Sequence, residues 1–139
     1  MTSGEELQRL YYTTLTGTAA IMALASGVYD NVPASPFGAK TAYISFGPSD
    51  STEDDPECGD VASGVEITTQ IDIWSRAVGA IEAKTLTDLV RKALHEKSLS
   101  LSENALVDTY VALTRVFRDP DGLTTHGVVQ VTAMIEEPS

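Results

Sequence analysis

The sequence predicts an α+β fold, in which an antiparallel sheet of about four to five strands carries a long helix and short N-terminal helices on one face. Three observations predict it. Residues 65–73 alternate between apolar and polar side chains, as in a strand with one buried face. Residues 80–95 repeat apolar side chains at helical spacing. Segments 106–118 and 124–136 are rich in β-branched residues and flank a turn sequence, which is typical of a hairpin.

Length, charge and cysteine content limit the classes to which the protein can belong. The 139 residues suffice for one core, and we expect a single domain over residues 1–139. The net charge of −11 disfavours binding to nucleic acid phosphates or to an anionic membrane surface. Cys58 is the single cysteine, so one chain forms neither an intramolecular disulfide nor a cysteine-based zinc site. This composition is compatible with a basic protein partner and with a reducing cytoplasm.

Two helices are expected at the N-terminus. Ser3 and Glu6 have the spacing of a capping box, and Gly17 ends the helix that they begin. Thr18 then caps a second short helix that runs to about Ala25. The apolar run within it is too short to span a bilayer, so we expect a core helix and no membrane contact.

An acidic segment separates two expected strands in the middle of the chain. Residues 28–40 contain proline and glycine and predict an extended connection, while residues 43–47 predict a strand. Residues 48–64 hold six acids and no base, so they predict a self-repelling surface loop. These acids are Asp50, Glu53, Asp54, Asp55, Glu57 and Asp60.

Trp74 interrupts the alternation of the strand that follows the acidic segment. It falls on the polar face, beside Asp72. A large aromatic side chain on such a face is covered either by another element or by another molecule. Two interpretations stay open: packing under the N-terminal helices or the acidic loop, and burial at a subunit contact.

The last third of the chain contains the long helix and the hairpin. The buried stripe of the helix at 80–95 comprises Leu86, Leu89, Val90, Ala93 and Leu94. Residues 98–102 predict a short edge strand. In the hairpin turn at 119–122, proline presets the backbone of the first turn residue and Gly122 accepts a positive φ.

Sequence motifs of catalysis and of metal binding are weak. The chain has no glycine-rich phosphate loop, no nucleophile elbow and no His-Glu-x-x-His motif. His95 and His126 lack an obvious local partner that would orient a general base, so we expect no enzyme and no cofactor. The acidic segment offers oxygen ligands for Ca²⁺ without EF-hand spacing. The acidic segment therefore has three interpretations. It is a solvated loop, or an acidic face turned toward a basic partner or passing DNA, or the site of a calcium-dependent binding module.

The pattern as a whole resembles the phage tail-completion family, also described as tail terminators or head–tail joining proteins. The matching segments are residues 28–33, 43–47, 71–76 with Gly79, 119–122, and His126 with Gly127. The most recognisable of them is the aspartate-hydrophobic-tryptophan-serine motif at Asp72 to Ser75, which precedes the long helix. The resemblance covers nearly the whole chain.

The resemblance implies a structural role in a tailed phage, prophage or gene transfer agent. A family member is expected to form a homo-oligomeric ring, usually a hexamer, which caps the tail tube and joins it to the head connector. DNA passes through the ring without specific binding. The protein is then a virion component of the neck region, assembled in the bacterial host cytoplasm. Within this interpretation we expect the interface residues to be Trp74, Asp50, Glu53, Asp54, Asp55 and Glu57.

Overall fold

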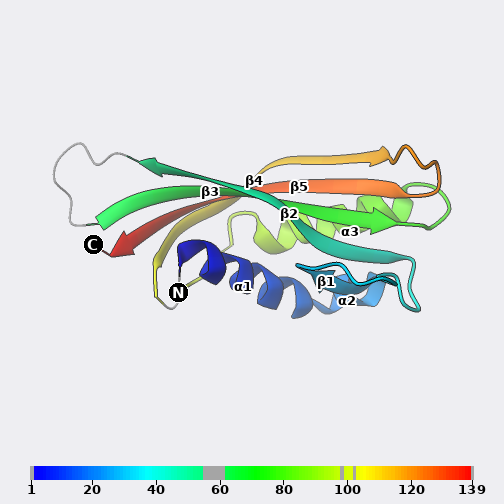
Figure 1. Cartoon of the computed structure of the whole chain (residues 1–139), viewed down its shortest axis with the longest axis horizontal. Helices are drawn as coiled ribbons and strands as arrows, with labels where there is room; N and C mark the ends of the chain where they lie inside the picture. The colour runs from blue at the N-terminus through cyan, green and yellow to red at the C-terminus, as the bar shows by residue number, and fades with distance from the viewer. Residues whose placement is uncertain (1, 55–61, 98, 102, 139) are drawn as a thin grey trace.

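The protein is a five-stranded sheet with a layer of three helices on one face (Figure 1). The computed structural model describes residues 2–54, 62–97, 99–101 and 103–138. Its elements are α1 (Ser3–Thr16), α2 (Ala19–Leu24), β1 (Ala25–Tyr29), β2 (Ala42–Asp54), β3 (Ala62–Ser75), α3 (Ile81–Leu94), β4 (Ala105–Arg118) and β5 (Thr125–Pro138). The strand order is β1-β2-β3-β5-β4, and the predicted α+β class is confirmed.

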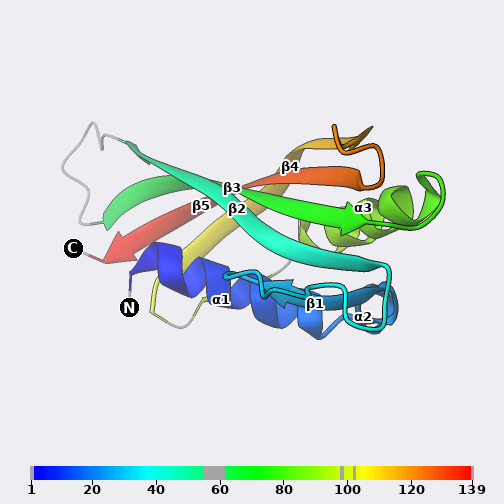
Figure 2. The ribbon, with the colours of Figure 1, turned by 45° about the vertical axis from the view of Figure 1, so that its right-hand side comes forward.

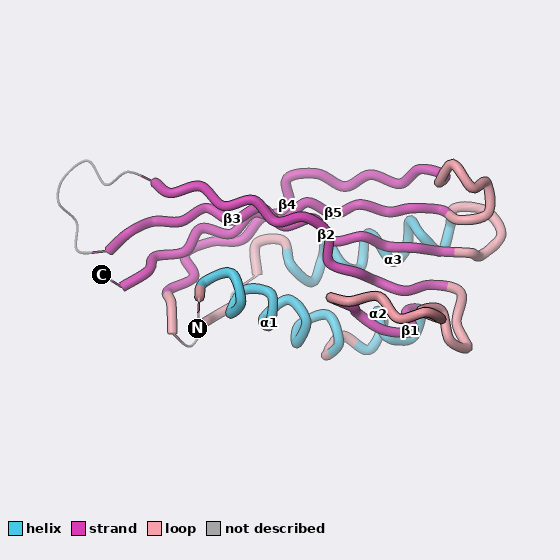
Figure 3. Tube along the Cα trace, viewed as in Figure 1, coloured by secondary structure: helices cyan, strands magenta, loops and turns pink. Residues whose placement is uncertain are grey.

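The centre of the sheet is a long antiparallel ladder between β3 and β5. It runs without a break from Ala62 opposite Pro138 to Ser75 opposite Thr125. β2 and β4 flank this pair as further antiparallel strands (Figure 3). β1 pairs in parallel with the first part of β2, from Ala25 opposite Ala42 onward. The sheet is therefore mixed, with one parallel pair that the sequence did not predict.

Every second residue of β3 faces the helices and builds the core. Val65, Ile67, Ile71 and Ile73 are all buried, as their alternation predicts. The intervening residues lie on the opposite side of the sheet, which we call the open face. α3 contacts β3, β4 and β5 from the helical side and also packs against α1 and α2 (Figure 2). The core therefore lies between one sheet face and the three helices.

α1 and α3 each have 14 residues and follow their apolar spacing. The expected stripe of α3 is buried at Leu86, Val90 and Leu94. In α1, Tyr11 is fully buried and its hydroxyl has no hydrogen-bond partner among the described residues. Burial raises the pKa of this tyrosine well above its ordinary range, because the phenolate would lie in an apolar core.

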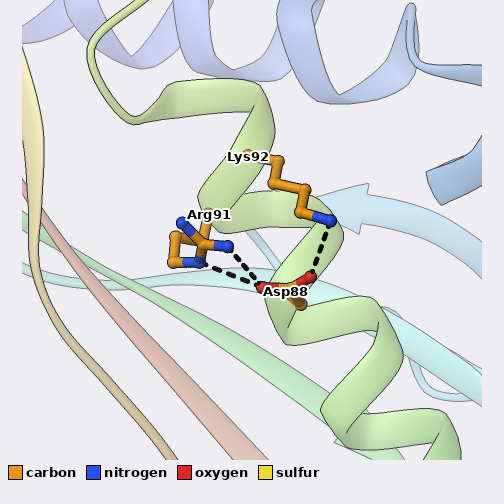
Figure 4. A network of polar contacts seen from close by, with 3 residues as sticks. All are labelled: Asp88, Arg91 and Lys92. Atoms are coloured by element: carbon orange, nitrogen blue, oxygen red, sulfur yellow. Dashed lines mark hydrogen bonds and ion pairs between the residues drawn. The ribbon is translucent and has the colours of Figure 1, made fainter.

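On the solvent side of α3, Asp88 forms ion pairs with Arg91 and Lys92 (Figure 4). An Arg91 amino group lies 2.7 Å from Asp88 Oδ1, and Lys92 Nζ lies 3.2 Å from Asp88 Oδ2. Hydrogen bonds from these two cations lower the pKa of Asp88. Because all three side chains are solvated, the network contributes little to the stability of the fold.

One of the two predicted N-terminal caps is wrong, and the other lacks its hydrogen bond. Thr2, not Ser3, caps α1, and its Oγ1 accepts a hydrogen bond from the Glu5 N–H at 3.2 Å. Thr18 is the N-cap residue of α2, as predicted, but its hydroxyl donates backwards to the Thr14 carbonyl and makes no capping bond. The Glu6 side chain points away from the helix end, toward the segment around Asn104. Its carboxylate accepts hydrogen bonds there from backbone N–H groups. Tertiary partners thus displaced the local capping pattern.

Three segment predictions also need correction. The connection expected from residue 28 begins inside β1, because the end of α2 runs directly into a strand beside β2. The loop expected at 48–64 is strand as far as residue 54 and again from residue 62, since both segments continue the ladder of β2 with β3. In the expected edge strand at 98–102, the described residues 99–101 are not strand, and residues 98 and 102 lie outside the description.

The hairpin turn between β4 and β5 is confirmed. The Asp119 N–H donates to the Thr124 carbonyl, and Gly122 has a φ of 73°, which favours glycine. Asp121 Oδ1 accepts hydrogen bonds from the N–H groups of Leu123 and Thr124. These bonds lower the pKa of Asp121, since they favour its ionised form. The turn fixes the register that places His126 opposite Phe117.

Candidate interface

A row of four rings crosses the open face of the sheet. The register places Tyr43, Trp74, His126 and Phe117 side by side on β2, β3, β5 and β4. Ring centroids are 6.3 Å apart for Tyr43 and Trp74, 3.8 Å for Trp74 and His126, and 4.9 Å for His126 and Phe117. The indole and the imidazole are almost parallel, with an angle of 14° between their planes. Four strands thus contribute to one continuous aromatic surface.

Polar bonds beneath this row fix the tryptophan. The Trp74 indole N–H donates to Ser45 Oγ at 3.0 Å. His126 Nε2 lies 2.7 Å from Asp72 Oδ1, which also accepts a hydrogen bond from the Gln70 amide at 2.9 Å. Asp72 and Ser45 are both buried, although they are on the open face. The bonds hold the ring of His126 against the indole and so orient the indole on the surface.

The Asp72 and His126 pair is the feature that sequence reasoning missed. The two residues are 54 positions apart and meet only because β3 pairs with β5 in this register. A carboxylate at this distance orients an imidazole, as in a general base. Here Trp74 covers a face of the imidazole and the Ser45 oxygen accepts the indole N–H, so the polar groups form a packed layer.

Tyr43 connects this row to the loop after β1. Its ring contacts Phe37 edge to face, with centroids 4.8 Å apart, and the Arg76 guanidinium lies 4.3 Å from the centroid of Phe37. Burial raises the pKa of Tyr43, while the positive charge of Arg76 opposes this rise and the negative charge of Asp72 adds to it. A cation therefore borders the aromatic row at the end of β3.

The position of Trp74 bears on the first of the two earlier interpretations, packing within its own chain. Its neighbours Ile73 and Ser75 point toward the helices, so Trp74 points to the opposite face. Packing under the N-terminal helices is therefore wrong. Asp50 does not cover the indole either, because it pairs with Thr68, six residues before Trp74 on β3. Trp74 stays half-buried among the rings of its own sheet.

The acidic residues are arranged along a strand. Asp50 and Glu53 are exposed on β2, where Asp50 lies opposite Thr68 and Glu53 opposite Val65. Thr68 belongs to the open face and Val65 to the helical face, so these two acids point in opposite directions and do not share one cation. Asp54 ends β2, and Asp55 and Glu57 lie outside the described residues.

The described ranges contain neither a metal-binding cluster nor a membrane-spanning helix. No group of three or more His, Cys, Asp and Glu side chains there is arranged to hold a metal ion. In the same part of the chain, no helix has both the length and the apolar character needed to cross a bilayer.

A groove of about 660 Å³ lies on the helical side of β2. It is lined by Gly4, Glu5, Gln8, Arg9, Tyr12, Thr13, Asp30, Phe46 and Ser49. α1 forms one wall and β2 the other. Tyr12 is 49% exposed in this wall, although it is one of the largest side chains of the chain. The groove is thus separate from the aromatic row, which lies on the opposite face of the sheet.

Comparison with known proteins gives two findings. The family model of the tail completion protein gp17 matches residues 11–136. A chain in the solved structure described as "Virion of native gene transfer agent (GTA) particle" is 27% identical to this chain. The likeness covers 96% of this chain and 96% of that chain, with a TM-score of 0.82. No curated protein sequence matches the chain.

Proposed function

The chain belongs to the tail completion protein gp17 family, and from this membership we propose that it forms a closed ring that ends the tail tube and joins it to the head. The protein is a structural component of a phage-like tail. The observation that carries the proposal is the likeness to a chain of a gene transfer agent virion over 96% of both chains. The proposed ring is a hexamer in the neck of the particle, assembled in the host cytoplasm.

A ring requires two different surfaces on each subunit, because its contacts are heterologous. The first candidate is the aromatic row around Trp74, which is half-buried and rigidly held. Oriented tryptophan and tyrosine side chains are favoured at protein interfaces. We assign Trp74 to a subunit contact, and we assign to the Asp72 and His126 pair the role of positioning its indole.

The second candidate surface is the acidic end of β2. Asp50 and Glu53 are exposed there, and Asp54, Asp55 and Glu57 follow in the sequence. In the proposed ring these acids face the lumen or a basic neighbour. Like charge lets DNA pass without specific binding, since phosphate neutralisation requires lysine and arginine. The tail-tube protein and the head connector are the proposed further partners.

The oligomeric state tests the proposal directly. Purified protein, measured by mass photometry and by negative-stain electron microscopy over a range of concentrations, is expected to form closed rings of one size. Immunogold labelling of purified particles is expected to mark the neck. A protein that stays monomeric at every concentration and is absent from particles contradicts the proposal.

Trp74→Ala is expected to separate assembly from folding. The half-buried indole lies outside the main core, so the monomer should stay folded, with a loss of about 1–2 kcal/mol in the free energy of unfolding. Ring formation should weaken by roughly 30-fold or more, as for a central interface residue. Thermal unfolding and mass photometry measure the two effects. The matched control is Trp74→Phe, which keeps an aromatic ring but loses the hydrogen bond to Ser45 and part of the indole's contact area.

Normal rings of the Trp74→Ala variant would exclude the indole from the subunit contact. An unfolded Trp74→Ala monomer would instead show that the aromatic row is part of the folding core.

A further inference from the structure

We propose that neighbouring copies in the ring join by strand addition, with residues 113–118 of β4 pairing antiparallel to residues 49–54 of β2 in the next copy. The inference rests on the proposed ring and adds a backbone contact to its aromatic contact, since Phe117 of the aromatic row lies within the β4 stretch. An unpaired strand edge presents a row of N–H and C=O groups that another strand can pair with. Each copy has one such edge on either side of its sheet.

The first free edge belongs to the second half of β2. β1 covers β2 only from Ala42 to Ser45, after which β2 is irregular between Phe46 and Ser49. From Ser49 to Asp54 the ladder with β3 is regular. No strand of the described chain pairs with the outer side of this stretch. Six residues of regular strand are therefore open on one side.

The second free edge belongs to the second half of β4, the last strand of the sheet. The first half is irregular at two places, between Leu106 and Asp108 and between Val111 and Leu113. Its outer side is already occupied there, because the Glu96 N–H donates to Thr109 and the Val111 N–H donates to His95 Nδ1. From residue 113 to residue 118 the strand is regular, and no described strand pairs with its outer side.

The two edges carry opposite charges, and the charged residues that meet lie on the same face of the sheet. β2 brings Asp50, Glu53 and Asp54, and β4 brings Arg115 and Arg118. Full antiparallel overlap of the two six-residue stretches sets Arg115 opposite Thr52 and diagonal to Asp50. Both Arg115 and Asp50 belong to the open face, since their in-sheet neighbours are Val128 and Thr68. Diagonal neighbours across strands are within reach of a long side chain.

The groove beside β2 provides space for the side chains on the helical face of the added strand. It lies beneath the free edge, between β2 and α1, and includes Tyr12, Phe46 and Ser49. Val116 belongs to the helical face of β4, because it lies opposite Gly127. In the proposed overlap Val116 of the next copy lies opposite Ser51 and brings its apolar side chain toward the exposed ring of Tyr12. The strand thus fills a groove that the isolated chain leaves open.

The choice of a second copy follows from the presence of both edges on one chain. Both edges have the same length, and Arg115 of one lies diagonal to Asp50 of the other. A contact between two different surfaces repeats around a closed ring, as the proposed function requires. The continuous sheet that results leaves no long free edge on any copy.

Cysteine cross-linking tests the register. In a Cys58→Ser background, Ser51→Cys with Val116→Cys places two thiols opposite each other across the proposed contact, at a distance that a disulfide spans. Mild oxidation is expected to give a covalent ladder up to the full ring on a non-reducing gel. The matched control, Thr52→Cys with Val116→Cys, has its thiols on opposite faces and should give no ladder. Each single-cysteine variant should give dimers at most.

Charge exchange tests the same contact without a covalent bond. Arg115→Asp is expected to weaken ring formation by about tenfold, and Asp50→Arg by a similar factor, while the double exchange recovers most of the loss. Mass photometry under reducing conditions counts the rings of every variant. Rings that form without the cysteine ladder would overturn the strand addition and leave the proposed function standing. Protein that forms no rings at all would overturn the proposed function itself.

Discussion

Replacement of Glu6 by leucine is expected to lower the free energy of unfolding by about 3 kcal/mol, because three hydrogen bonds end on this one buried carboxylate. Glu6 Oε2 accepts the Glu103 N–H at 2.9 Å, and Oε1 accepts the Asn104 N–H at 3.0 Å and the Asn104 side-chain amide at 3.3 Å. Glu6 is only 6% exposed, so water does not replace the lost acceptor. The start of β4 then loses its attachment to α1.

Two variants make this result specific. Glu5→Leu makes the same chemical change at the neighbouring exposed position and should alter the unfolding free energy by no more than about 0.5 kcal/mol. Glu6→Gln keeps the shape and one acceptor oxygen, so its loss should be smaller than that of Glu6→Leu. Urea unfolding followed by circular dichroism measures all three. Equal stability of Glu6→Leu and the wild type would show that the carboxylate does not hold the segment at 103–104.

Replacement of Gly127 by alanine is expected to lower the free energy of unfolding by about 2 kcal/mol, because the new methyl group enters the packed layer between β5 and α3. A Cβ atom at this position overlaps Thr87 Oγ1 and lies 3.2 Å from Ile73 Cβ. Thr87 is 3% exposed on α3, so its side chain has little room to yield. The helix must shift away from the sheet to accept the substitution.

Removal of the Thr87 hydroxyl is expected to rescue the Gly127→Ala variant. The Thr87 hydroxyl is buried without a hydrogen-bond partner among the described residues, so Thr87→Ala alone costs little. Combined with Gly127→Ala it should restore most of the lost stability, since it removes the overlapping atom. Gly4→Ala is the control, because a Cβ there meets nothing within 4 Å and alanine favours the helix. Additive losses in the double variant would show that Thr87 is not the obstacle.

Most of the fold follows from local patterns. The alternation at 65–73 predicted the central strand, and the helical spacing after residue 80 predicted α3 within one residue of its observed start and end. The turn at Asp119 to Gly122 predicted the hairpin. These segments carry their information in neighbouring residues, because burial on one side imposes the same period along the whole element. The family resemblance rests on the same segments and is confirmed.

Local patterns were less informative where distant partners decide the structure. Residues 48–54 look like a charged loop, yet the ladder to β3 keeps them in a strand. Ser3 and Glu6 look like a capping box, yet Asn104 provides donors for Glu6. A polar side chain such as Glu6 can satisfy its hydrogen bonds either locally or with a partner about a hundred residues away. A local sequence pattern does not reveal which of the two arrangements forms.

The sequence by itself determined the α+β class, the antiparallel hairpin, the acidic character of the chain and the Asp72 to Ser75 motif by which the family is recognised. The tertiary structure alone decided which side chains surround that motif. Antiparallel pairing of β3 with β5 brings His126 onto Trp74 and Asp72 onto His126. The physical reason is that side-chain alternation fixes two faces of a strand, whereas only strand register fixes which distant residues share a face.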